Sequence, residues 1–147
     1  MSSFSIDSCV PAPVCKDKKY TWKGSSQNPE RITPKQKYLG DSSTTDWVMD
    51  GQAITYEDSL LLTMAKDTVG TVLATSTYMW YGSVTARLKT SRGRGVVTAF
   101  ILLSDVKDEI DYEYVGVDLK TAQTNYYFQG IPKCAFYLPS HPSSEPY

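Results

Sequence analysis

The sequence lacks long apolar runs and has no excess of charge of either sign. No stretch of about 18 consecutive apolar residues occurs, so nothing predicts a membrane-spanning helix. Its 147 residues carry 15 basic and 16 acidic side chains, for a net charge of -1. This balance gives no reason to expect nucleic acid or an anionic membrane as a partner. The length favours one domain, and residues 1–4 have neither a basic start nor an apolar run, so no signal peptide is expected.

Metal-binding side chains are also scarce, with three cysteines and one histidine. Cys9 and Cys15 bracket Val-Pro-Ala-Pro-Val, a short extended loop that a disulfide could close. Cysteines that bind a metal are more often separated by about two to four residues, with further ligands nearby, and His141 supplies no second ligand. The spacing therefore favours a disulfide and an oxidising compartment over a metal site. Cys134 is left over as a free thiol, and no cofactor is expected.

No amphipathic stretch of about 12 residues or more indicates a helix. From Asp46 onward the sequence instead shows short β-like runs separated by turn residues. The runs are 47–49, 60–64, 78–88, 96–103, 109–115 and 125–129. Strands of this length and spacing predict an all-β sandwich. The run 96–103 is nearly all apolar and is expected to be a buried strand, and a helix over 58–66 is disfavoured because Leu60-Leu61-Leu62 has no polar face.

Two segments have the composition of turns or linkers. Ser91-Arg92-Gly93-Arg94-Gly95 lies between two expected strands, and a hairpin turn that uses the freedom of glycine at positive φ is preferred over a phosphate nest or an RNA-binding patch. From Lys133 the composition changes, and the Pro/Ser-rich end of the chain is expected to be a disordered tail.

The most informative run is the acidic one. If it forms a strand, Glu109, Asp111 and Glu113 share one face, because successive side chains point to opposite faces. Such a row of like charges is destabilising. A catalytic role or a cation-binding role for the three acids is therefore favoured over a strand face that is only solvated. An EF-hand loop is excluded because Glu113 stands where that loop needs glycine. A P-loop ATPase is excluded because no G-x-x-x-x-G-K-[ST] motif occurs. Metal-assisted folding by the acids stays open, and it predicts a Ca²⁺-dependent rise in melting temperature.

Two carboxyl groups that flank one bond are the apparatus of glycoside hydrolysis. Retention of configuration needs one as nucleophile and one as acid, about 5–5.5 Å apart. The Cα atoms of residues four apart on a flat strand are about 13 Å apart, so the strand must be twisted and concave. Asp111, the acid in the middle, can hydrogen-bond a neighbouring acid and hold that neighbour in one charge state. A third acid also raises the free-energy cost of ionising all three.

Four segments in order resemble glycoside hydrolase family 16. The run Glu109–Gly116 resembles its active-site strand, and 80–89, 95–100 and 123–130 are similar to three further strands of the family. The segment Cys-Val-Pro-Ala-Pro-Val-Cys, together with Tyr-Met-Trp-Tyr-Gly, resembles the fungal Crh subgroup of cell-wall chitin–glucan transglycosylases. The resemblance covers about residues 4–132. It implies a concanavalin A-like β-sandwich (jelly roll) whose C-terminal half this chain lacks, and it makes 1–132 a partial catalytic domain and 133–147 a tail outside it.

The resemblance also implies roles for individual residues. Glu109 matches the nucleophile, Asp111 the helper acid and Glu113 the general acid/base. Asn125 and Tyr127 match substrate contacts.

Two further side chains complete the expected groove. Gln129 is expected on the same face as Asn125 and Tyr127, and Tyr81 is a candidate for stacking on a sugar. For Tyr81 and Tyr127, core packing is the alternative.

The resemblance makes the expected partners chitin and β-glucan chains, and the expected location the fungal cell wall. We expect a monomer that links chitin to β-glucan by a double displacement. The alternative is a catalytically inert or sugar-binding fragment, because half a sandwich leaves sheet edges and one apolar face unpaired.

Overall fold

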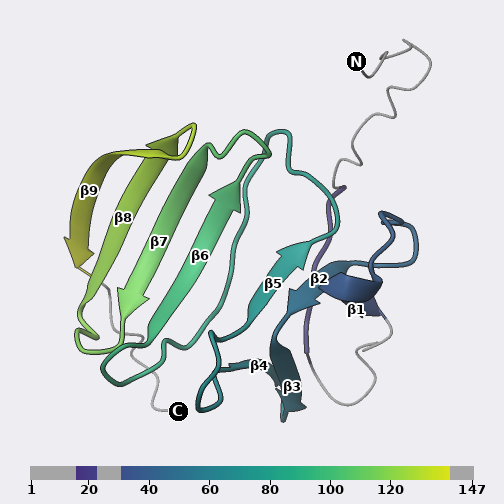
Figure 1. Cartoon of the computed structure of the whole chain (residues 1–147), viewed down its shortest axis with the longest axis horizontal. Helices are drawn as coiled ribbons and strands as arrows, with labels where there is room; N and C mark the ends of the chain where they lie inside the picture. The colour runs from purple at the N-terminus through teal and green to yellow at the C-terminus, as the bar shows by residue number, and fades with distance from the viewer. Residues whose placement is uncertain (1–15, 23–30, 140–147) are drawn as a thin grey trace. The chain divides into compact units, whose positions relative to one another are not determined.

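The computed structural model describes residues 16–22 and 31–139, and within them the chain is all-β apart from short 3-10 turns (Figure 1). It divides between Val84 and Thr85 into two compact units. The elements are β1 Ile32–Pro34, η3 Lys35–Lys37, β2 Trp47–Asp50, β3 Gln52–Tyr56, β4 Ser59–Thr63, β5 Val72–Thr75, β6 Val97–Leu103, β7 Glu109–Val115, β8 Thr121–Phe128 and β9 Ile131–Pro139. No helix in this part of the chain is long and apolar enough to cross a membrane.

The first unit contains two small sheets. One has the order β1-β2-β5, with β1 parallel and β5 antiparallel to β2, and the other is the hairpin β3-β4. The runs 47–49 and 60–64 are strands as predicted, and no helix forms over 58–66. The chain turns after β2 at Gly51, whose φ is 103° and whose added Cβ would lie 2.5 Å from the carbonyl oxygen of Gly70. Only glycine fits so close an approach of two backbones.

Aromatic side chains attach the segment 16–22 to β2 within the first unit. The Trp47 ring on β2 lies 4.9 Å from the Tyr20 ring in an edge-on arrangement and 6.2 Å from the Trp22 ring. Large rings in such arrangements stabilise beyond the area that they bury. The segment is therefore held to β2 by ring packing rather than by strand pairing.

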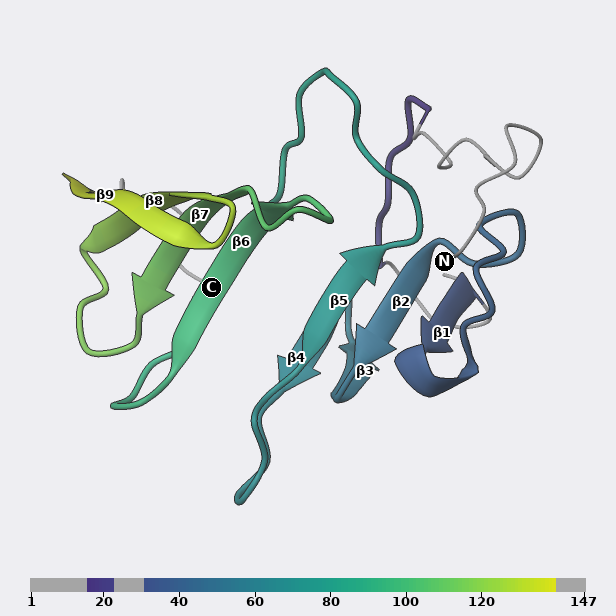
Figure 2. The same cartoon turned by 45° about the horizontal axis from the view of Figure 1, so that its top comes forward.

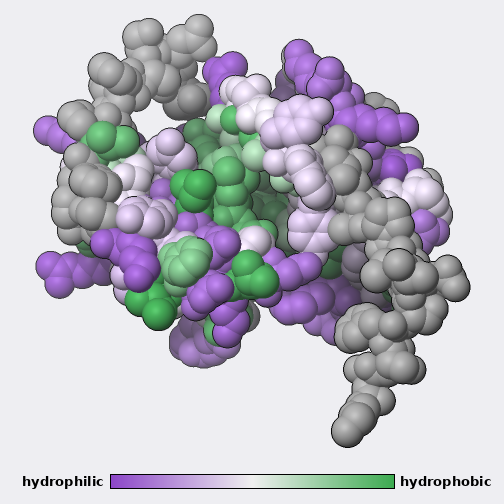
Figure 3. Space-filling view, turned by 90° about the horizontal axis from the view of Figure 1, so that it is seen from above, coloured by the Kyte–Doolittle hydropathy of each residue, from purple (hydrophilic) through white to green (hydrophobic). Residues whose placement is uncertain are grey.

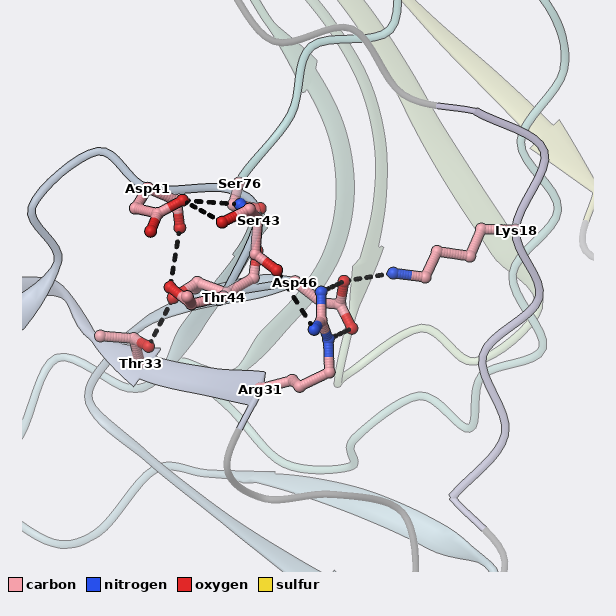
Figure 4. Close-up of polar contacts among 9 residues, drawn as sticks. Lys18, Arg31, Thr33, Asp41, Ser43, Thr44, Asp46 and Ser76 are labelled. Atoms are coloured by element: carbon pink, nitrogen blue, oxygen red, sulfur yellow. Dashed lines mark hydrogen bonds and ion pairs between the residues drawn. The ribbon is translucent and has the colours of Figure 1, made fainter.

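A cluster of ions beside these rings holds the same segment (Figure 4). Asp46 is 9% exposed, and Lys18 and Arg31 both bind its carboxylate, Arg31 with Nη2 2.7 Å from Oδ1. The hydrogen bonds from Arg31 lower the pKa of Asp46 to about 2, with a further contribution from Lys18. Three segments that are distant in the sequence are thereby joined at one carboxylate.

The second unit is one antiparallel sheet with the order β6-β7-β8-β9. Neighbouring strands are consecutive in the sequence and lie side by side in both views (Figures 1 and 2). The β8–β9 turn consists of Gln129 and Gly130, with φ of 50° and 78°. Two central residues at positive φ match the twist of the flanking strands. β7 pairs on both edges, so the acidic run lies inside the sheet.

The expected burial of 96–103 is wrong, although β6 is a strand. Alternate apolar side chains of β6 are exposed, Leu103 by 61%. Among the described residues Ala122 is the one buried apolar side chain, and apolar groups are visible at the surface (Figure 3). An apolar strand is buried on both faces only when another layer covers each face, and within the described residues of this unit no second layer does so.

The run 78–88 differs from the expected strand. Tyr78 forms an isolated bridge, residues 79–96 belong to no strand, and residues 81–89 are exposed. A strand requires a ladder of hydrogen bonds to a neighbour, and apolar alternation does not supply that neighbour. The segment 91–95 is a turn in which Gly93 and Gly95 have positive φ, but it is not a hairpin because no strand precedes it.

The region from Lys133 also differs from the expected tail. Residues 133–139 belong to β9, which pairs with β8 along its length. Their sequence, Lys-Cys-Ala-Phe-Tyr-Leu-Pro, contains aromatic residues that are favourable in strands, and the adjacent Pro/Ser-rich composition obscured this signal. The predicted Cys9–Cys15 disulfide and residues 140–147 lie outside the described residues.

Candidate active site

The acidic row lies on β7, which has a partner strand on both edges. Glu109, Asp111 and Glu113 alternate along it, so they share one face of the sheet. On β8, Tyr127 is directly opposite Glu109, and Asn125 is directly opposite Asp111. The structure therefore brings five of the candidate residues onto one face of two adjacent strands.

Burial along β7 differs between its two faces. Asp111 is 3% exposed and both glutamates are half-buried, whereas Ile110 on the other face is 52% exposed. In a soluble sheet the apolar face is usually the covered one. On β7 the acids are the less exposed side chains, whereas on β6 the residues directly opposite Glu109 and Asp111, Leu103 and Ile101, are exposed.

Asp111 has an unusual environment for a carboxyl group. Its Oδ1 is buried and has no hydrogen-bond partner. Buried polar atoms are nearly always paired, so such an atom indicates strain, a proton or a missing ligand. A buried acid between two others is a costly arrangement that packing alone does not require.

The environment shifts the pKa of the first acid. Burial raises the pKa of Glu109, and a hydrogen bond to Asp111 and the charges of Asp111 and Glu113 raise it further. Each of these effects disfavours the ionised form. Glu109 therefore retains its proton to higher pH than an isolated glutamic acid would.

The last acid of the row has a defined partner on the neighbouring strand. Asn125 Nδ2 donates a hydrogen bond of 2.9 Å to Glu113 Oε2. The pair is diagonal in the ladder, because the residue directly opposite Glu113 is Gln123. Diagonal neighbours are within reach of each other in antiparallel sheets.

Two other candidate substrate contacts lie elsewhere. Gln129 is exposed in the β8–β9 turn rather than on the strand face. Tyr81 is 86% exposed and belongs to the first unit. The structure does not bury Tyr81 in a core.

The sequence interpretation missed the role of Asp108, the residue just before the row. Its Oδ1 accepts a hydrogen bond of 2.9 Å from the backbone N–H of Gln129, and the Gly130 N–H donates to the Lys107 carbonyl at 2.8 Å. The β6–β7 loop and the β8–β9 turn are thereby tied together at the Glu109 end of the row. No local pattern predicts this contact, because its partners are 21 residues apart.

A metal site is not visible in this arrangement. Within residues 16–22 and 31–139, no group of three or more His, Cys, Asp or Glu side chains is arranged to hold a metal ion.

Comparison with known families places this site in context. Residues 41–145 match the family described as glycosyl hydrolases family 16. The chain belongs to this family. The match includes the whole of the β6–β9 sheet and extends beyond residue 132, and the all-β architecture agrees with the family's jelly-roll sandwich.

Similar proteins are known from several fungi. The chain is 60% identical over 129 residues to Crh-like protein 3 of Botryotinia fuckeliana, and the alignment covers 88% of this chain and 28% of that protein. It is 54% identical over 132 residues to Crh-like protein 2 of Aspergillus fumigatus, and the alignment covers 89% of this chain and 29% of that protein. It is 47% identical over 131 residues to Congo red hypersensitive protein 2 of Saccharomyces cerevisiae, and the alignment covers 88% of this chain and 27% of that protein. The chain thus spans less than a third of the length of these relatives, and no solved structure matches it.

Proposed function

We propose that the acidic row serves a retaining glycosidase or transglycosylase that acts on cell-wall polysaccharides and links chitin to β-glucan. The observation that supports this most strongly is the placement of Glu109, Asp111 and Glu113 on one face of β7 in a chain of this family. Names such as Crh-like protein 3 and Congo red hypersensitive protein 2 belong to the relatives, and the substrates proposed here rest on the Crh resemblance of the sequence.

In the first step Glu113 protonates the leaving glycosidic oxygen while the Glu109 carboxylate attacks the anomeric carbon. The bond from carbon to the leaving oxygen breaks, and a glycosyl ester on Glu109 forms. In the second step Glu113 removes the proton from an acceptor hydroxyl, which displaces Glu109. A sugar acceptor gives a cross-link, and water gives hydrolysis.

Asp111 is proposed to serve the nucleophile. It is buried beside Glu109, and the hydrogen bond between them is among the causes that raise the pKa of Glu109. This hydrogen bond is the contact through which Asp111 would act on the nucleophile.

The test is transfer of a labelled chito-oligosaccharide to a β-glucan acceptor by the full chain. We expect Glu109→Gln to reduce transfer to background, because an amide cannot form the glycosyl ester. The matched control is Glu57→Gln, the same change at an exposed residue in the turn between β3 and β4. If Glu109→Gln transfers label as well as the unchanged chain, the assignment is wrong.

A second candidate is sugar binding without turnover. It is favoured by the exposed apolar side chains of the β6–β9 sheet. Binding of chito-oligosaccharide that is unchanged by Glu109→Gln, with no label transferred by either protein, would support this candidate over the enzyme.

A further inference from the structure

We infer that Asn125 is a positioning residue that holds the Glu113 carboxyl group, rather than only a contact for the sugar. The inference rests on the proposed function, since it gives Glu113 the role of acid and base. The hydrogen bond of 2.9 Å from Asn125 Nδ2 to Glu113 Oε2 is the starting observation.

The direction of the Asn125 amide supports this inference. Asn125 is opposite Asp111 in the ladder, and Asp111 carries a buried oxygen without a partner. The amide nevertheless donates to Glu113, the diagonal neighbour. A residue that only satisfied buried polar groups would be expected on the unpartnered oxygen, so the local geometry favours control of Glu113.

The surroundings of Glu113 contain no competing cation on the three strands that form its face. On β6 the residues of this face are apolar, including Ala99 opposite Glu113. On β7 the neighbours are the acids Asp111 and Glu109, and on β8 they are neutral amides and the Tyr127 phenol. The hydrogen bond from Asn125 therefore meets no competition from a cation on these strands for the orientation of this carboxyl group.

This contact divides the two oxygens of Glu113 between two tasks. Oε2 accepts the hydrogen bond from Asn125, which leaves Oε1 to carry the proton to the leaving group and to take it from the acceptor. Fixing one oxygen also limits rotation of the carboxyl plane, which keeps the other in line with the scissile bond.

The first experiment does not require activity. In the full chain, the side-chain amide ¹H and ¹⁵N resonances of Asn125 should shift with pH as the acidic row titrates. We expect Glu113→Gln to abolish most of that shift. The amide of Gln123, directly opposite Glu113, is the internal control and should change less. If the pH-dependent shift of the Asn125 amide resonances is unchanged in Glu113→Gln, the inference is overturned.

The second experiment separates positioning from sugar binding by kinetics. Removing the amide in Asn125→Leu should lower kcat on an unactivated oligosaccharide about 10- to 100-fold, part of what a general acid contributes. KM should stay within about twofold. On an aryl glycoside with a good leaving group, which needs little protonation, the loss in bond cleavage should be much smaller.

A near-isosteric second variant guards against misfolding. Asn125→Asp keeps the shape of the side chain but lacks amide protons, so it should show the same dependence on the leaving group. Gln123→Leu should show no loss of kcat that depends on the leaving group. An equal rise in KM on both substrates would mean that Asn125 contacts the sugar instead, and the inference would be rejected while the role of Glu109 remained intact.

Discussion

Gly116 lies directly against the backbone of Gly93. The Gly93 N–H donates to the Gly116 carbonyl at 3.0 Å, and the Gly116 N–H donates to the Val96 carbonyl at 2.8 Å. A Cβ on Gly116 would lie 2.4 Å from the Gly93 carbonyl oxygen. The glycine that ends the acidic motif is thus required by a backbone contact, and this contact joins the end of β7 to the turn before β6.

Gly116→Ala should therefore destabilise the second unit. The added methyl group meets backbone that cannot rotate away, and overpacking of this kind typically costs about 1–3 kcal/mol. Urea unfolding of the full chain measures the loss, and amide exchange at Gly93 should accelerate locally. Gly95→Asn is the control: Gly95 has φ of 81° with nothing within 4 Å of its added Cβ, and asparagine tolerates that conformation. Equal losses in both variants would show that the close contact is unimportant.

Asp108→Ala should loosen the β8–β9 turn. The variant leaves the Gln129 N–H without its acceptor and removes a hydrogen bond to a charged group, which is typically worth about 1.5–3 kcal/mol when enclosed and less in this exposed turn. We expect faster hydrogen exchange at Gln129 and little change at Asp118, whose N–H lies in a separate turn. Asp108→Asn keeps an acceptor oxygen and should restore most of the protection. Protection at Gln129 that persists in Asp108→Ala would contradict this role.

The strands were predictable where the pattern was local. Alternation of acids with apolar residues placed β7 at Glu109–Val115, and the structure has the same bounds. The run 78–88 has similar alternation, but the structure has no strand there. The difference is that β7 has two neighbours that supply hydrogen bonds, and a neighbour cannot be deduced from the run itself.

The site was predictable in its types of residue but not in its contacts. The period of two placed the three acids on one face, and the structure has them there. The period of two could not show that Asp111 is the buried acid of the three or that the Asn125 side chain donates to its diagonal neighbour Glu113. Those facts depend on register between strands, and register is set by the turns, including the contact from Asp108 to Gln129.

Asp46→Asn should destabilise the first unit at neutral pH. The pKa of Asp46 is lowered to about 2 from 3.8, so its ionised form favours the folded state. This contribution, about 2 kcal/mol, is present above pH about 4 and is lost as the pH falls toward 2. Urea unfolding followed by Trp fluorescence, which includes the adjacent Trp47, should show a wild-type advantage at pH 7 that disappears near pH 2.

The ion pair of Asp50 with Lys35 is the control for Asp46. Its atoms are 3.1 Å apart, and both side chains are largely exposed, so Asp50→Asn should cost less than about 1 kcal/mol. If Asp46→Asn costs no more than Asp50→Asn at pH 7, the cluster does not hold the unit together.

Glu109→Gln should change the pH dependence of stability in the opposite direction. Burial and the neighbouring acids raise the pKa of Glu109, so the folded state binds this proton more tightly than the unfolded state. The contribution is fully present below the unfolded value of 4.5 and is lost as pH rises through the raised pKa. The uncharged glutamine avoids that loss, so the Tm of Glu109→Gln minus that of wild type should increase between pH 4 and pH 8. Glu57→Gln supplies the baseline, and a difference that stays flat or falls with pH would mean that the folded state does not raise the pKa of Glu109.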